Sequence, residues 1–437
     1  MIIVDTQLRV RAAEGRPLRF GMFGAGFMGH GIANQVVRYL PGLSLAAICN
    51  RTVTSAISAF TQAGVPRDQI IEVRTTGALE DAIADGRFAV TDDPEVLCAA
   101  PSLGVLLEAT GHVEYGARVT ALAIEHAKHM VLMNAELDAT VGPLLKHRAK
   151  AAGVLLSGCD GDQPGAQINL LRFVQSLGLR PRVCGNIKGL QDRYRTPETQ
   201  QAFARQWGQT PEMVTSFADG TKISFEQAIV ANATGMGVAV RGMLGIEHRG
   251  SIDEVTALYD IAELRSRGGI VDYVIGALPS PGVFVFAECQ DSTQAHLLDY
   301  GKLGSGPLYS FYVPYHLTAL EAPLSVARVA LVGDTVIAPR AGPVVDVVAT
   351  AKRDLRPGEI LDGIGGFMTY GLCENYPVSR AHDFLPMGIA EGARLLRPVN
   401  RDQPLTYGDV ELARDRLSST LRAEQDTMFQ PLFNEPS

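Results

Sequence analysis

The chain has 437 residues, which is too long for one hydrophobic core and predicts two or three domains. A hydrophobic content of 46% and a charged content of 20% are ordinary for a soluble globular protein, and a net charge of -8 offers no basic surface to nucleic acid. No membrane-length apolar run or signal peptide is evident, and the six scattered cysteines predict neither a disulfide framework nor a zinc site. We therefore expect a cytoplasmic protein with a small-molecule substrate, no nucleic-acid or membrane partner and, on base rate, a homodimeric assembly.

A glycine-rich turn follows the first apolar strand, after a short leading helix within residues 1–18, and it precedes a helix expected over residues 30–39. The first glycine of such a turn lets the chain turn tightly, the second lets a pyrophosphate approach, and the third lets the helix pack on the sheet. The flanking strand and helix predict a dinucleotide-binding turn whose helix N-terminus faces the phosphates. The expected cofactor contacts are Gly24, Gly26, Phe27, Met28 and Gly29.

Asn50 and Arg51 stand at the tip of the second predicted strand, residues 43–49. A cofactor with a free ribose 2′-hydroxyl usually meets an acid there, whereas an arginine can hold a 2′-phosphate. This tip has no acid, so the sequence favours NADP over NAD, with both residues beside the adenosine ribose. The alternative is that Arg51 only solvates a loop.

Helix and strand signals then alternate, which predicts a Rossmann-type, doubly wound parallel sheet in an α/β domain over residues 1–157. Ligands of such sheets sit outside the carboxyl ends of the strands, so Thr110, Gly111 and Asn134 are expected beside the cofactor. Asn134 is the candidate that orients the nicotinamide carboxamide or a substrate hydroxyl. The expected helices cover residues 54–63, 79–86, 115–127 and 140–152, and the strands residues 103–109, 129–134 and 154–157.

A glycine-rich crossing at residues 158–165 predicts a boundary, after which residues 158–340 are expected to form an α+β substrate domain with an open sheet. Residues 341–437 carry frequent turn signals and predict a small, mainly β domain closed by a helix over residues 409–427. In the middle domain, the expected strands are residues 182–188, 222–225, 270–275 and 283–287, and the expected helices residues 166–177, 224–233 and 252–265.

Lys188, at the end of a predicted strand, is the first candidate for the general acid that protonates the carbonyl oxygen during hydride transfer. An exposed strand-end lysine without a catalytic role is the alternative. Glu136, Asp160 and Asp162 are grouped near the predicted cleft and are expected to act as a base, to hold a divalent cation, or to anchor lysines.

Three further side chains are candidates for substrate contacts. Asp162 and His316 offer polar atoms for a substrate oxygen, and Arg249 offers a bidentate fork for a phosphate or carboxylate. The loop of Lys302 is a second anion candidate, whereas Lys222 is interpreted as a hairpin residue.

Three blocks of the chain resemble known families. The glycine turn with residues 107–111 and 131–134 resembles the nucleotide domain of the homoserine dehydrogenase-like oxidoreductases. The second block is similar to the deoxyxylulose-phosphate reductoisomerase-like branch of that superfamily, and the third resembles an SAF domain, a small β-clip fold. The second block comprises residues 268–273, 280–285, 304–307 and 314–318, and the third runs from residues 354–359 to 404–406.

The departures from these families narrow the expected function. Homoserine dehydrogenases follow the strand-end Asn with Lys, but Asn134 is followed by Ala135 and Glu136, and of the reductoisomerase-like basic cluster only Lys188 is kept. The leading hypothesis is NADP-dependent reduction of a small polyhydroxylated keto compound, such as a phosphorylated or branched sugar. This hypothesis includes a version in which the carbon skeleton of the substrate is rearranged before reduction, and that reaction would need a divalent metal. The alternatives are a homoserine dehydrogenase and a dinucleotide-sensing or scaffold protein without turnover.

Overall fold

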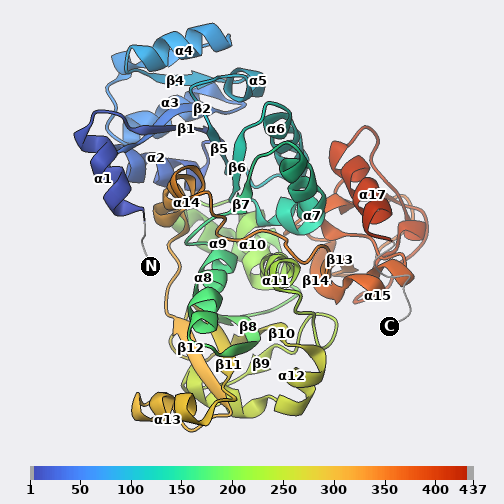
Figure 1. The fold of residues 1–437 in the computed structure, drawn as a ribbon. Helices are drawn as coiled ribbons and strands as arrows, with labels where there is room; N and C mark the ends of the chain where they lie inside the picture. The colour runs from blue at the N-terminus through green and yellow to red at the C-terminus, as the bar shows by residue number, and fades with distance from the viewer. Residues whose placement is uncertain (1–3, 431–437) are drawn as a thin grey trace. The chain divides into compact units, whose positions relative to one another are not determined.

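The computed structural model describes residues 4–430 and divides the chain into two compact units. Unit 1 comprises Met1–Gly165 and Leu317–Ala338, and unit 2 comprises Ala166–His316 and Pro339–Ser437. The chain therefore returns to unit 1 for one segment before it completes unit 2 (Figure 1). The three-domain division at residues 157/158 and 340/341 remains a prediction.

Unit 1 contains a seven-stranded sheet in the order β3-β4-β2-β1-β5-β6-β7, and every neighbouring pair is parallel. This confirms the predicted Rossmann-type α/β fold. The two strands that sequence analysis did not predict, β3 and β4, are short. The strands are β1 (Leu18–Phe23), β2 (Leu43–Cys49), β3 (Ile70–Glu72), β4 (Phe88–Thr91), β5 (Val105–Glu108), β6 (His129–Leu132) and β7 (Leu156–Gly158).

The helices of unit 1 include one from the returning segment, α14, which packs on α2 and contributes Val326 and Val329 to the same hydrophobic core (Figure 1). Several helices begin earlier than predicted, among them α2, whose N-cap is Gly26, and α7, whose N-cap is Asn134. The helices are α1 (Asp5–Ala13), α2 (Phe27–Tyr39), α3 (Val53–Gln62), α4 (Thr76–Ala84), α5 (Pro94–Cys98), α6 (Val113–Glu125), α7 (Ala135–Ala151) and α14 (Thr318–Val332), with a 3₁₀ turn η1 (Arg67–Gln69).

Unit 2 contains a five-stranded mixed sheet in the order β12-β11-β8-β10-β9. The strands β8, β10 and β9 run parallel, while β11 is antiparallel to both of its neighbours, β8 and β12. It follows that β12 runs in the same direction as β8. The strands are β8 (Arg180–Lys188), β9 (Ile246–Glu247), β10 (Ile270–Ile275), β11 (Gly282–Glu288) and β12 (Leu308–Val313).

The strand expected over residues 222–225 is wrong, because these residues form the first turn of helix α11, where both Ile223 and Phe225 are buried. A helix buried on most of its surface loses the one-sided pattern that distinguishes it from a strand. The helix expected over residues 252–265 is interrupted where Asp260 caps a new helix. The helices are α8 (Gln163–Ser176), α9 (Pro197–Trp207), α10 (Pro211–Asp219), α11 (Thr221–Thr234), α12 (Ile261–Arg267) and α13 (Ser292–Tyr300), with a 3₁₀ segment η2 (Ile252–Leu258).

Residues 339–430, named here the C-terminal module, contain two small antiparallel sheets, β13-β14 and β15-β16. The final helix begins at Leu417, later than residue 409, because a 3₁₀ turn and a short strand occupy residues 407–411. Between residues 4 and 430, no helix combines the length and apolar character that a membrane span requires. The elements are β13 (Val345–Ala351), β14 (Thr369–Asn375), β15 (Arg394–Leu395), β16 (Val410–Glu411), α15 (Tyr376–Ala381), α16 (Met387–Ala390), α17 (Leu417–Phe429) and η3 (Tyr407–Asp409).

Candidate active site

In the glycine turn of unit 1, the first and third glycines are required for steric reasons, and the second leaves space for a ligand. Gly24 has φ 101°, a left-handed value that side chains disfavour. A Cβ on Gly29 would lie 2.6 Å from the carbonyl oxygen of Gly24, so only glycine allows α2 to approach the turn. A Cβ on Gly26 would meet nothing within 4 Å, which leaves open space at the N-terminus of α2. No side chain of the described residues caps that N-terminus, so its backbone N–H groups are suited to an anion.

Asn50 supports this turn from the end of β2. Its Oδ1 accepts a hydrogen bond from the Ala25 backbone N–H at 3.0 Å, and its Nδ2 donates to the Thr52 carbonyl at 2.9 Å. The neighbouring Arg51 is exposed, and its guanidinium makes no ion pair or hydrogen bond within residues 4–430. Asn50 is thus occupied as a support, whereas Arg51 is available to a ligand.

The ends of β5 and β6 are joined by buried polar side chains. Glu108 Oε1 accepts from the Thr110 backbone N–H at 2.9 Å and from the Thr110 hydroxyl. Asn134 is 1% exposed; its Oδ1 caps α7 by accepting from Leu137 N at 3.0 Å, and its Nδ2 donates to the His112 carbonyl at 3.2 Å. These bonds make Asn134 a support for the strand-end loop, and its direct contact with cofactor or substrate remains a prediction.

Two buried acids that sequence analysis did not single out lie in this region. Burial raises the pKa of Glu108 to about 7, although bonds from Thr110 and Asn134 favour the charged form. Its Oε2 has no hydrogen-bond partner among residues 4–430. Burial alone raises the pKa of Asp138, on α7, to about 7. A glutamate inside an apolar strand was the signal available in the sequence, since an acid is rarely buried without a role.

The proposed acidic group is not assembled as a cation site. Asp160 accepts from Ser325 Oγ at 3.1 Å and pairs with Arg328 of α14 at 3.6 Å, so it anchors an arginine rather than a lysine. Glu136 is buried, and Asp162 is half-buried. Across residues 4–430, no three His, Cys, Asp or Glu side chains are grouped to hold a metal ion.

In unit 2, the topology brings three predicted residues to one edge of the sheet. Lys188 ends β8, Arg249 follows β9 and His316 follows β12, and these three strands run in the same direction. The Lys188 carbonyl accepts from Gly276 N at 2.8 Å, and a Cβ on Gly276 would lie 3.9 Å from Arg249 Cγ. Lys302 precedes β12 and therefore lies toward the opposite edge.

Of the substrate candidates at this edge, Arg249 is exposed and makes no side-chain ion pair or hydrogen bond within the described part of the chain. His316 is half-buried. Adjacent strands are about 4.8 Å apart, and β9 and β12 are each two strands away from β8. Arg249 and His316 are therefore each roughly 10 Å from Lys188 along this edge. A substrate with an anionic group could therefore contact both Lys188 and Arg249.

A network of buried amide and carboxyl side chains lies beside the Lys188 side chain. Its side chain is 14% exposed, and its Nζ lies 3.9 Å from Oε2 of Glu226 on α11. The same carboxyl oxygen accepts from Asn186 Nδ2 at 2.9 Å, and Asn186 Oδ1 accepts from Gln167 at 2.5 Å and Gln227 at 3.0 Å. The network is a polar floor that fixes the carboxylate beside the ammonium.

No pattern in the sequence predicts the roles of Gln167, Glu226 and Gln227. Only Asn186 and Lys188 carry a local signal, because alternate residues of a strand share a face. The other three belong to α8 and α11, and no spacing in the chain connects those helices with β8.

Comparisons with known proteins bear on the middle of the chain. Residues 161–322 match the family model for the catalytic domain of oxidoreductase DRL. The chain is an oxidoreductase. Its parallel sheet and glycine turn are those of an NAD(P)-dependent enzyme. No curated protein matches the chain.

Several solved structures are similar to the chain at low identity. The aldose-aldose oxidoreductase of Caulobacter crescentus is 14% identical, with a TM-score of 0.41 and coverage of 75% of this chain and 93% of that one. An oxidoreductase of Thermotoga maritima is 12% identical, with a TM-score of 0.39 and coverage of 74% and 92%. The scyllo-inositol dehydrogenase of Lactobacillus casei is 11% identical, with a TM-score of 0.33 and coverage of 63% and 67%. These likenesses carry no conclusion about substrate, and the comparisons give no support to the homoserine dehydrogenase-like, reductoisomerase-like or SAF resemblances.

Proposed function

We propose that the protein is an NADP-dependent oxidoreductase that reduces a small polyhydroxylated keto compound, such as a phosphorylated or branched sugar. The observation that carries this proposal is the position of Lys188 at the carboxyl edge of the unit 2 sheet, beside a buried carboxylate. Arg249, which has no ion pair or side-chain hydrogen bond within residues 4–430, lies two strands away at the same edge. A cation that can donate a proton and a second cation that can hold an anionic group suit a polar, charged carbonyl compound.

Each group has one task in this proposal. The glycine turn and the N-terminus of α2 are suited to the pyrophosphate, and Arg51 to the 2′-phosphate. NADPH, when bound, supplies the hydride that reduces the carbonyl carbon. Lys188 donates a proton to the carbonyl oxygen, which yields the alcohol, and the resulting neutral amine takes a proton from water. Glu226, whose Oε2 lies 3.9 Å from Nζ, orients the ammonium.

Replacement of Lys188 tests the catalytic assignment. With NADPH and a panel of keto sugars and sugar phosphates, we expect Lys188→Met to lower kcat at least about 100-fold, the usual contribution of a general acid. NADPH binding, followed by nucleotide fluorescence, should stay at the wild-type level. Lys302→Met is the matched control, because Lys302 is an exposed lysine toward the other edge of the sheet. Equal turnover by both variants would refute the role of Lys188.

Replacement of Arg51 tests the choice of cofactor. We expect Arg51→Ala to raise the KM for NADPH about tenfold or more, since it removes a charge-assisted bond to the 2′-phosphate, and to leave the KM for NADH unchanged. Steady-state kinetics with both nucleotides measure this ratio. A parallel change for NADH would instead indicate that Arg51 shapes the loop.

A further inference from the structure

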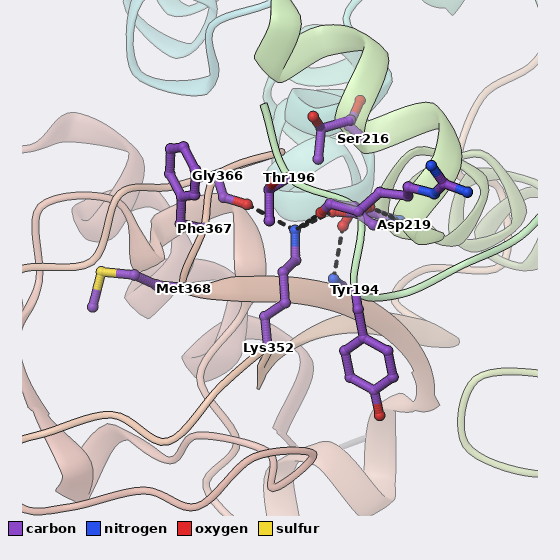
Figure 2. A network of polar contacts seen from close by, with 12 residues as sticks. Tyr194, Thr196, Ser216, Asp219, Lys352, Gly366, Phe367 and Met368 are labelled. Carbon is purple, nitrogen blue, oxygen red and sulfur yellow. Dashed lines mark hydrogen bonds and ion pairs between the residues drawn. The ribbon is translucent and has the colours of Figure 1, made fainter. Parts of the chain in front are cut away.

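The loop of residues 189–196, which follows Lys188, is fastened to the C-terminal module by a buried lysine. Lys352 is 3% exposed at its side chain, and its three N–H groups have three acceptors. They donate to the Arg195 carbonyl at 2.8 Å, to Asp219 Oδ2 at 2.9 Å and to the Gly366 carbonyl at 2.7 Å. Figure 2 shows the ammonium pointing toward Asp219 and the Gly366 carbonyl beneath the loop. A fully bonded, buried ammonium fixes the position of its acceptors.

A second attachment is built around Asp402 of the module. Its Oδ2 accepts from the Tyr194 hydroxyl at 2.8 Å, and its Oδ1 accepts from the Tyr370 hydroxyl at 2.9 Å. Guanidinium groups cover both rings: Arg193 lies 5.6 Å from the centre of Tyr370, and Arg401 lies 4.9 Å from the centre of Tyr194. Burial acts to raise the pKa of Asp402, but the tyrosine bonds and the arginine charges outweigh it and lower the pKa. The carboxylate is therefore the form that ties the loop to the module.

The same loop is also held on the side of α10 and α11. Asp192 N donates to the Ala218 carbonyl at 2.8 Å. The Gln191 side-chain nitrogen fills the place that a Cβ on Gly220 would occupy. Residues distant in sequence thus hold the loop from two sides, and one of those sides is the C-terminal module.

We propose that the C-terminal module is a clamp that positions the loop of residues 189–196 and, through it, Lys188, with Asp402 and Lys352 as positioning residues. The inference rests on the proposed function of Lys188. Its physical basis is that the clamped loop begins at the residue after Lys188, so a shift of the loop changes where the strand end places the ammonium. Displacements of about 1 Å at a reacting group lower rates strongly.

Glycine substitution tests the clamp without straining the backbone. Asp402 has φ 65°, a left-handed value that glycine adopts without steric strain. The substitution Asp402→Gly therefore removes the carboxylate and leaves the left-handed turn intact. Tyr194→Phe removes only the hydroxyl on the opposite side of the same bond. The matched control is Asp383→Gly, because Asp383 is an exposed aspartate of the same module with φ 49°, and its side chain makes no bond within the described residues.

Hydrogen exchange followed by mass spectrometry measures the loop directly in the full-length protein. We expect peptides covering residues 189–196 to exchange at least about tenfold faster in Asp402→Gly and faster in Tyr194→Phe, since a bond to a charged group is lost. Peptides of β10 should be unchanged, and Asp383→Gly should match the wild type throughout. On any keto substrate that the wild type reduces, kcat should fall in Asp402→Gly with little change in the KM for NADPH.

The outcomes separate the clamp from the catalytic assignment. Unchanged exchange in Asp402→Gly, or an equal change in Asp383→Gly, overturns the clamp. Faster exchange with wild-type kcat overturns the positioning of Lys188 by the loop. If Lys188→Met retains full turnover, the proposed function fails, while the exchange data still decide whether the module holds the loop.

Discussion

Glu108, a single buried side chain of unit 1, makes the stability of the folded protein depend on pH. It is fully buried at the end of β5, it is bonded to Thr110, and burial raises its pKa from 4.5 to about 7. The folded protein therefore keeps a proton that the unfolded chain has already released between these pH values. The stabilisation is fully present below about pH 4.5 and is lost as the pH rises through about 7. The shift corresponds to about 3 kcal/mol.

We expect Glu108→Gln to flatten this pH dependence, because glutamine keeps an acceptor for Thr110 and carries no charge. Urea unfolding at pH 5 and pH 8 measures it: the variant should resemble the wild type at pH 5 and be more stable at pH 8 by up to about 3 kcal/mol. Asp138 acts in the same direction, so some pH dependence will remain. Glu72→Gln, at a half-exposed acid paired with Arg74, should keep the wild-type slope. An equal slope in both variants would contradict the assignment.

At the level of helices and strands, local sequence patterns predicted the glycine turn after β1 and the parallel arrangement of the strands in the unit 1 sheet. The steric requirements at Gly24 and Gly29 belong to one short motif, so the sequence pattern was sufficient to predict the turn. Helix α11 was partly misread, because its burial on most sides removed the periodicity that a surface helix shows. Short strands such as β3 also carry little pattern.

The second and third glycines of the turn, Gly26 and Gly29, should respond differently to alanine. We expect Gly29→Ala to destabilise the protein by about 1–3 kcal/mol, since its Cβ would overlap the Gly24 carbonyl. Gly26→Ala should leave stability within about 0.5 kcal/mol, because its Cβ meets open space, but it should weaken NADPH binding. Urea unfolding and a fluorescence titration of NADPH separate the two effects. Loss of stability in Gly26→Ala would show that the open space is needed for folding rather than for the ligand.

At the scale of the whole molecule, the chain crosses between its two units more than once. Helix α14 follows the unit 2 sheet in sequence but completes the unit 1 core, and the C-terminal module packs within unit 2. Within unit 2, the Lys352–Asp219 pair joins the residue that follows β13 of the module to the end of α10. Burial raises the pKa of Asp219, while the ion pair with Lys352 opposes that rise.

We expect Lys352→Met to destabilise the protein by about 3–5 kcal/mol, because it leaves a buried carboxylate without its cation. The double variant Lys352→Met with Asp219→Asn should recover part of this loss, since no uncompensated charge remains. Urea midpoints of the wild type, both single variants and the double variant complete the cycle, with Lys302→Met as an exposed control. Additive losses without recovery would mean that the pair contributes packing rather than charge compensation.

Short-range sequence patterns were sufficient to predict the class of the nucleotide fold, the glycine turn, the acid-free tip at Arg51 and the placement of Lys188 at a strand end. All of these depend on short-range requirements of the backbone or on the two-residue period of a strand. The contacts between distant residues became visible only in the folded chain. Glu226 lies beside Lys188, Asp402 accepts a hydrogen bond from Tyr194 in the loop that follows Lys188, and Arg328 pairs with Asp160. Such contacts are set by how helices and sheets pack, and no local spacing along the chain encodes them.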